Sequence, residues 1–267
     1  MGSRSWIASA AVGLLLAGAS TVFLSTGDSL QQPTMSVEGQ LGFSDGLHRV
    51  HVKDMSATSE KLTLRSGEGI AMRQFDDVKR WLSDVKAVEE EDQLEAGHEL
   101  PDDQEHEMAA ILARHIQAMD PERAGKCPRW TLASVIYRKG KGKSYTNDVH
   151  RDLSEVSTAN LREHEGQVYF YNAWVPRRDV HSSPLALALP STVDIANDAS
   201  GFLGMEHDTT GLTYRDSHQW LYWSGMRLGD VIFWRSDLVY HASFQLPGEE
   251  SLPPRVSMDM RIYFHDS

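Results

Sequence analysis

Three side chains in this sequence have the types and the order of an iron site: His150, Asp152 and His241. Two imidazoles and one carboxylate on one face of a metal are the ligands with which many proteins hold non-haem Fe(II), and they leave neighbouring positions open. Residues i and i+2 of a strand point to the same side, so His150 and Asp152 can converge on one point. With His241 on a distant strand, the pattern predicts an Fe(II) centre with room for a co-substrate and O₂.

The order of features after the His-x-Asp pair is more informative than the pair itself. In a chain with 12 histidines such a pair is expected by chance. Downstream, however, the Gly229-Asp230 turn leads into an apolar strand, His241 follows that strand, and Arg255 comes later with Ser257 two residues beyond it. An arginine and a serine at this spacing share one face of a strand, where both can donate hydrogen bonds to one carboxylate.

This order resembles the Fe(II)/2-oxoglutarate-dependent dioxygenase superfamily. Within it, the sequence is most similar to the bacterial and fungal hydroxylase/desaturase family that includes the cephamycin methoxylation protein and fungal meroterpenoid oxygenases. The resemblance covers roughly residues 130–267. The segments that carry it are His150–Ser154, Asn172–Pro176, Ser183–Ala186, Gln219–Trp223 and Pro254–Arg261.

The resemblance implies that the three ligands bind Fe(II) and that 2-oxoglutarate chelates the metal as co-substrate. Arg255 and Ser257 would hold the far carboxylate of 2-oxoglutarate, and Asn172 and Tyr137 would flank the co-substrate. O₂ would then be activated with release of succinate, and a ferryl intermediate would abstract hydrogen from the substrate. The expected outcome is hydroxylation or desaturation of a small, natural-product-like molecule.

Two further residues are candidate substrate contacts, Trp174 and Arg261. Trp174 would contribute to an apolar pocket that keeps water from the reactive centre. Arg261 would act as a substrate clamp, although its place in the sequence suits a structural ion pair equally well. The oligomeric state is left open.

Two other functions compete with this prediction. The first is a catalytically silent jelly-roll binding or partner protein tethered to a membrane. The second is a metal enzyme without 2-oxoglutarate, in which Arg255 and Ser257 hold the carboxylate of the substrate itself. Hydrolases are poorly supported, because the sequence has neither the His-Glu-x-x-His motif of zinc proteases nor a Gly-x-Ser-x-Gly elbow.

The composition narrows the possible partners. The net charge of −12 argues against nucleic acid as a partner, since phosphate binding needs a basic face. Residues 89–107 hold ten carboxylates and no lysine or arginine, which is typical of a solvated loop. The single cysteine, Cys127, excludes an intrachain disulfide and suits a small buried side chain.

The elements that must position the site are expected to be mainly β with bracing helices. Helical spacing of apolar residues predicts helices over 75–88 and 104–119, and seven short strands follow between residues 131 and 264. This order is typical of a double-stranded β-helix, the cupin-like jelly roll. The expected organisation is a linker or peripheral strands over 28–70, helical support over 71–129 and a catalytic core over 130–267.

The amino terminus predicts a different kind of segment. Residues 5–27 carry no charge, and residues 6–24 are predominantly apolar, which is long enough for a helix that spans a bilayer. Residues 1–27 are therefore expected to be a signal-anchor or a cleaved signal peptide. The expected location is a single-pass membrane anchor or the secretory pathway, with the catalytic domain on the non-cytoplasmic side.

Overall fold

The computed structural model describes residues 35–58, 62–65, 68–86, 99–139, 147–153, 155–200 and 209–266. The expected signal-anchor or signal peptide at residues 1–27, with its apolar helix, lies outside these residues. So does the part of the acidic run over 87–98. Within the described ranges, no helix combines the length and the apolar character needed to cross a membrane.

The described chain is mainly β, with two long helices before most of the strands. The helices are α1 (Asp76–Lys86), α3 (Asp102–Met119), α4 (Glu155–Glu165) and the short α5 (Ile195–Asp198). The strands are β1 (Ser36–Phe43), β2 (Gly46–Asp54), β3 (Ile70–Gln74), β4 (Arg129–Lys139), β5 (His150–Arg151), β6 (Val168–Pro176), β7 (Leu185–Ala188), β8 (Ala199–Ser200), β9 (Thr210–Leu212), β10 (Trp220–Tyr222), β11 (Asp230–Arg235), β12 (His241–Ser243) and β13 (Val256–His265).

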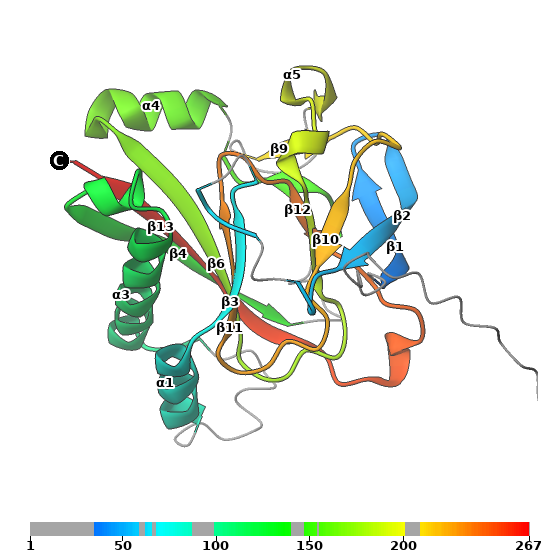
Figure 1. Ribbon diagram of the computed structural model, residues 1–267, viewed down its shortest axis with the longest axis horizontal. Coiled ribbons are helices and arrows are strands. Elements are labelled where there is room, and N and C mark those ends of the chain that lie inside the picture. The colour runs from blue at the N-terminus through cyan, green and yellow to red at the C-terminus, as the bar shows by residue number, and fades with distance from the viewer. Residues whose placement is uncertain are drawn as a thin grey trace, which may run out of the picture. The chain divides into compact units, whose positions relative to one another are not determined.

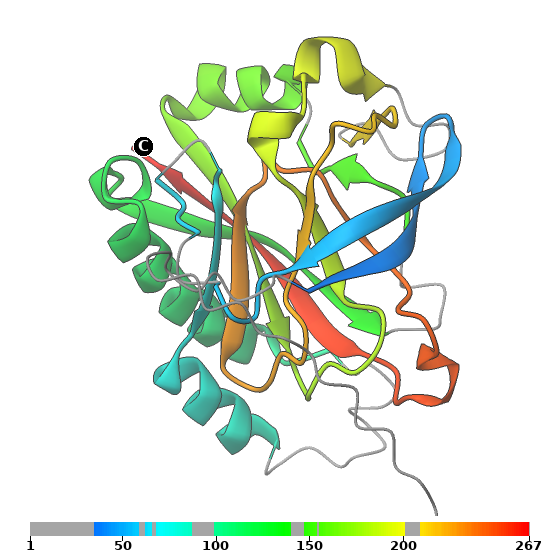
Figure 2. The same ribbon diagram turned by 45° about the vertical axis from the view of Figure 1, so that its right-hand side comes forward.

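These strands form two curled sheets that face each other, as in a jelly roll (Figures 1 and 2). One sheet has eight strands in the order β1-β2-β10-β7-β12-β5-β9-β8, and the other has five in the order β3-β11-β6-β13-β4. Strands that are far apart in sequence are therefore neighbours, because β12 lies between β7 and β5, and β13 lies between β6 and β4. This arrangement brings residues from four distant segments to one site.

The outer face of the five-stranded sheet is covered by α1 and α3 (Figure 1). On β13, Met258, Met260 and Ile262 pack into the apolar core that these helices share with β6 and β11. Cys127 is buried beside the same core, and burial, reinforced by Asp266, raises the pKa of its thiol to about 11. The cysteine is thus a small buried side chain, as expected.

The inner face of the same sheet turns toward the eight-stranded sheet. Alternation on β13 places Ser257, Asp259 and Arg261 on this side, opposite the methionines. Trp174 of β6 and Trp234 of β11 pack between the sheets with Leu187 of β7. The space between the sheets is therefore apolar around these two tryptophans and Leu187, and strongly polar along β13.

The structure contains the elements expected from the sequence and adds others, among them α4 and several short strands. Both expected helices are present, and so are the seven expected strands. The segment over 28–70 contains a long hairpin, β1–β2, that lies at one edge of the eight-stranded sheet (Figure 2). The end of the acidic run, from Asp102, is the first part of α3 rather than loop, because carboxylates are favourable near the amino end of a helix.

Candidate metal centre

His150 and His241 are direct partners across the antiparallel β5–β12 pair. Both are buried, with 4% of each residue exposed, and their ring centroids lie 4.4 Å apart. The Nδ1 atom of His150 lies 2.7 Å from the carbonyl oxygen of Asp148, and Nδ1 of His241 lies 3.5 Å from that of Val239. A proton on Nδ1 leaves the Nε2 lone pair of each ring available to a metal.

Asp152 completes the cluster that the sequence predicted. Its Oδ1 lies 3.8 Å from Nε2 of His150, and its Oδ2 lies 3.6 Å from Nε2 of His241. Both separations are shorter than twice the ligand distance of about 2.1 Å that is typical of divalent metals bound to nitrogen and oxygen. One ligand atom from each of the three residues lies within 4.8 Å of the others, so a single ion fits between them.

The protonation states in this cluster suit a metal. Burial, together with the neighbouring His150, lowers the pKa of His241 to about 3 and keeps its ring neutral. Burial opposes the charge of Asp152, but His241, Arg261 and His150 outweigh it and lower the pKa of the carboxyl group. Neutral imidazole and ionised carboxylate are the forms that bind a metal ion without first losing a proton.

Asn172 and Arg261 hold the carboxylate of Asp152 from the five-stranded sheet. The Asn172 amide donates to Oδ2 of Asp152 at 2.8 Å, and Arg261 Nη2 donates to Oδ1 at 2.5 Å. The hydroxyl of Ser236 donates in turn to the carbonyl oxygen of Asn172. Asn172, expected beside the co-substrate, thus orients a ligand of the metal centre. For Arg261 the sequence suggested either a structural ion pair or a substrate contact, and the structure shows the ion pair with Asp152.

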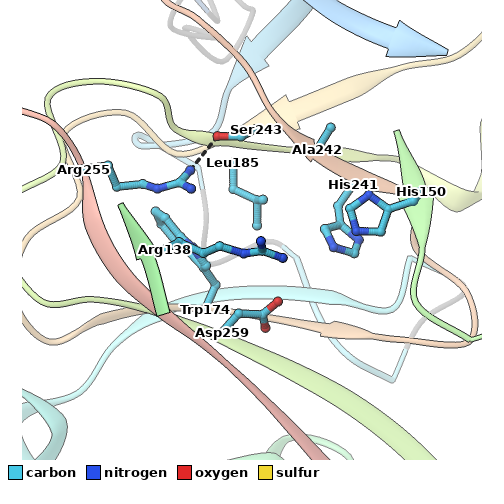
Figure 3. Close-up of a pocket in the computed structure, with 9 residues that line it drawn as sticks. All are labelled: Arg138, His150, Trp174, Leu185, His241, Ala242, Ser243, Arg255 and Asp259. Atoms are coloured by element: carbon cyan, nitrogen blue, oxygen red, sulfur yellow. Dashed lines mark hydrogen bonds between the residues drawn. The ribbon is translucent and has the colours of Figure 1, made fainter. Parts of the chain in front are cut away.

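Arg255, Trp174 and both histidines line one cavity (Figure 3). Arg255 Nη1 donates to the hydroxyl of Ser243 at 2.6 Å and to the carbonyl oxygen of Ser183, and its guanidinium lies 5.5 Å from the centroid of Trp174. These contacts hold the arginine in one orientation inside the cavity. The structure therefore brings Arg255 and Trp174 to the two histidines, as the sequence predicted.

Ser257 also lies at the inner face, on β13, two residues after Arg255, which directly precedes that strand. It is fully buried, and its hydroxyl has no hydrogen-bond partner among the described residues. A buried hydroxyl without a partner costs free energy, and such groups in native proteins commonly have a functional explanation. The inner face of β13 thus has one donor that a ligand would satisfy, although Ser257 is not among the residues that line the cavity.

Tyr137 is not part of the site, which corrects the expectation that it flanks the co-substrate. It pairs with Met258, whose side chain belongs to the helix-facing core, so Tyr137 points to the same outer side. There its hydroxyl donates to Glu105 at 2.7 Å and accepts from the backbone nitrogen of Leu100 at 2.8 Å. Burial, with the Glu105 hydrogen bond, raises the pKa of Tyr137 well above its usual range.

Two charged residues of the cavity, Arg138 and Asp259, are not among the candidate site residues predicted from the sequence. Arg138 follows Tyr137, pairs with Ser257 across the sheet and lines the cavity (Figure 3). Asp259 is buried. Its Oδ1 accepts a hydrogen bond at 3.1 Å from the Asn172 amide, which also donates to Asp152. Burial and the charge of Asp152 raise the pKa of Asp259 to about 6. Alternation along β13 from Arg255 and Ser257 was the sequence signal that pointed to Asp259.

The arrangement of these two sheets is similar to that of solved iron- and alpha-ketoglutarate-dependent enzymes. One structure of the iron and alpha-ketoglutarate-dependent endoperoxidase NvfI superposes with a TM-score of 0.67 at 15% identity, over 89% of this chain and 100% of that chain. A second NvfI structure gives 0.66 at 16% identity, over 87% and 98%. The epimerase SnoN, with a TM-score of 0.48 at 18% identity over 78% of this chain and 84% of that chain, is too distant to bear on function.

The sequence itself places the chain in a family. The family model described as "Oxidoreductase/YMDC permease-like domain" matches residues 29–264, and the chain belongs to that family. No curated protein matches the chain. The superfamily resemblance expected from the sequence is therefore confirmed at the level of the fold, and the chemistry must be argued from the site.

Proposed function

We propose that this protein is a non-haem Fe(II)/2-oxoglutarate-dependent oxygenase that hydroxylates or desaturates a small molecule. The observation that carries the proposal is the buried cluster of His150, Asp152 and His241, whose ligand atoms lie within 4.8 Å of one another, with both histidines at the wall of the cavity that contains Arg255. Two nitrogens and one carboxylate oxygen are the ligands that non-haem Fe(II) oxygenases use.

Some residues of the site would bind the metal, and others would bind the co-substrate. His150, Asp152 and His241 would hold Fe(II), which, when bound together with 2-oxoglutarate, supplies the oxidising chemistry on O₂. Arg255 provides a planar guanidinium already fixed by Ser243, and guanidinium groups bind carboxylates with paired, charge-assisted hydrogen bonds. The unpartnered hydroxyl of Ser257 would donate a further hydrogen bond to the same carboxylate.

The surroundings of the cluster favour a catalytic iron centre over a site that only binds a metal ion. Asp152 is oriented by Asn172 and Arg261, and such contacts to metal ligands fix ligand geometry. Trp174 and Leu185 line the cavity and limit the access of water to it. The name of the structural neighbour NvfI, an iron and alpha-ketoglutarate-dependent endoperoxidase, supports the same pair of cofactors.

Uncoupled turnover tests this function without knowledge of the substrate. Full-length protein with Fe(II), 2-oxoglutarate and O₂ should release succinate slowly, and succinate release should stop when either Fe(II) or 2-oxoglutarate is omitted. His241→Ala should abolish it, whereas His51→Ala, which changes an exposed histidine of β2, should leave it unchanged. Succinate release by His241→Ala at the wild-type rate would reject the proposal.

A further inference from the structure

A second cavity adjoins the metal centre at Asp152. It has a volume of about 250 Å³ and lies against the inner side of β4, β6 and β13, with Leu161 of α4 at its wall. Asp152 lines this cavity, whereas His150 and His241 line the cavity that contains Arg255. A metal held between the three ligands would therefore lie at the junction of two separate spaces.

Most of the wall of the second cavity is apolar. Phe170 and Tyr263 contribute aromatic rings whose centroids lie 5.9 Å apart with an angle of 36° between their planes. Leu153 and Leu161 complete the apolar surface. Pockets that bind small molecules are lined in this way, with a few polar groups that fix orientation.

Arg261 supplies the main polar group of that wall. Its Nη2 atom donates a hydrogen bond to Asp152. Its Nε atom, in contrast, is buried and has no hydrogen-bond partner within the described part of the chain. An N–H group in this position is costly unless an acceptor meets it. The geometry thus provides one unsatisfied donor in a mostly apolar cavity, next to the metal ligand Asp152.

The charges around this donor select the kind of acceptor. Asp152 already neutralises Arg261, and Asp259 places a second carboxyl group close by through the shared amide of Asn172. An anionic group on a ligand would lose its hydration in this mostly apolar space without gaining an unpaired cation. A neutral carbonyl or hydroxyl oxygen can accept the hydrogen bond without that cost.

The size of the cavity limits the ligand further. Drug-sized ligands occupy pockets of roughly 300–1,000 Å³, and this cavity is smaller. Its volume corresponds to roughly eight water molecules at about 30 Å³ each. A compact group of one or two rings matches that volume.

We infer that this cavity holds the reacting part of the substrate, a neutral and mostly apolar molecule of one or two rings whose oxygen accepts a hydrogen bond from Arg261. The inference rests on the proposed function, because it assigns the substrate of that reaction. It places the substrate in a cavity separate from the one that contains Arg255.

Three matched probes test the inference: 2-indanone, which is neutral with one carbonyl, indane, which has no acceptor, and indane-2-carboxylate, which is anionic. Dissociation constants are measured by NMR titration of each probe with the full-length protein. We expect 2-indanone to bind at least fivefold more tightly than either of the other two. Arg261→Lys keeps a cation beside Asp152 but removes the Nε donor, so it should reduce the preference for 2-indanone over indane to less than twofold.

Variants that fill the cavity locate the binding site. Leu161→Trp on α4 and Ser134→Leu on β4 should each weaken 2-indanone binding at least fivefold, so the test survives if one variant fails to fold. Leu47→Trp, at a residue that is 61% exposed in the first hairpin, should not change it. Equal binding by wild type and folded filled variants, tighter binding of indane-2-carboxylate, or no binding of 2-indanone would each overturn the inference. Because succinate release is measured separately, its presence alongside any of these results would leave the oxygenase proposal standing.

Discussion

Asn172 Nδ2 lies 2.8 Å from Oδ2 of Asp152, and this contact joins the two sheets at the metal centre. Asn172 belongs to β6 of the five-stranded sheet, whereas Asp152 directly follows β5 of the eight-stranded sheet. The carboxylate is thereby fixed relative to the two histidines, which come from the eight-stranded sheet alone. Docking of the sheets against each other therefore sets the geometry of the third ligand.

Asn172→Ala should weaken metal binding without removing any ligand. Loss of a group that orients a metal ligand typically reduces metal affinity by about 10- to 100-fold, and the same range is expected here. The measurement is an anaerobic competition titration for Fe(II) with a chelator. Asn197→Ala, which removes an exposed asparagine that contacts Asp194, is the matched control. An unchanged Fe(II) affinity in folded Asn172→Ala would show that the contact to Asp152 has no role in the centre.

Ser257→Ala should affect stability and co-substrate binding in opposite directions. The mutation removes a buried hydroxyl that has no partner among the described residues, so the protein without ligands should become more resistant to thermal unfolding. If the hydroxyl binds the carboxylate of 2-oxoglutarate, the KM for 2-oxoglutarate should rise by about tenfold, because hydrogen bonds to charged groups are worth about 1.5–3 kcal/mol.

Ser224→Ala provides the comparison for that variant. The hydroxyl of Ser224 donates to Asp54, so its removal should lower stability and leave the KM for 2-oxoglutarate unchanged. A Ser257→Ala protein that is less stable and has the wild-type KM would contradict the role given to Ser257.

Glu249 should act on 2-oxoglutarate binding at a distance, through Ser183. Its carboxylate accepts from the backbone nitrogen of Ser183 at 2.7 Å and from the Ser183 hydroxyl at 3.0 Å, and it holds this residue at a left-handed φ of 49°. The carbonyl oxygen of Ser183 in turn accepts from Arg255. Glu249→Ala should raise the KM for 2-oxoglutarate several-fold while Fe(II) affinity is retained.

The exposed neighbour Glu250 is the control for this effect, because Glu250→Ala should leave the KM unchanged. Glu249→Gln, which retains one acceptor oxygen, should fall between Glu249→Ala and wild type. Equal KM values in wild type and Glu249→Ala would show that Glu249 does not influence 2-oxoglutarate binding through Ser183 and Arg255.

Neighbouring substitutions on β4 test which face of that strand belongs to the site. Tyr137→Phe loses the hydrogen bonds to Glu105 and Leu100, so the free energy of unfolding should fall by about 1–2 kcal/mol with no change in the KM for 2-oxoglutarate. Arg138→Gln removes a positive charge from the cavity and should raise that KM. A changed KM for 2-oxoglutarate in Tyr137→Phe, together with an unchanged KM in Arg138→Gln, would show that the two faces of β4 have been assigned wrongly.

The error at Tyr137 has a physical cause that sequence alone does not reveal. The register between β13 and β4 shifts between Arg261 and Ile262, so that Arg261 pairs with Ser134 but Ile262 pairs with Leu132. Alternation counted along β4 from Leu132, which packs toward the helices, would place Tyr137 in the cavity. The extra residue at the bulge reverses this assignment.

The ligand cluster was predictable because it depends on few structural details. His150 and Asp152 are two residues apart, and His241 lies at the start of β12, which pairs with β5, so strand order alone brings them together. The contacts of Asn172 and Arg261 with Asp152 depend on how the two sheets dock, which no local pattern encodes. The second cavity, which needs α4 above the inner face of β6 and β13, could not be foreseen for the same reason.

The visible absorption of the anaerobic protein with Fe(II) and 2-oxoglutarate tests the central claim most directly. Chelation of ferrous iron by the 2-oxo acid within the His150, Asp152 and His241 cluster should produce a metal-to-ligand charge-transfer band. The band should be absent with Fe(II) alone and absent in folded His241→Ala, and it should persist in His51→Ala. A folded wild-type protein that shows no band, or a His241→Ala protein that shows the full band, would contradict the account.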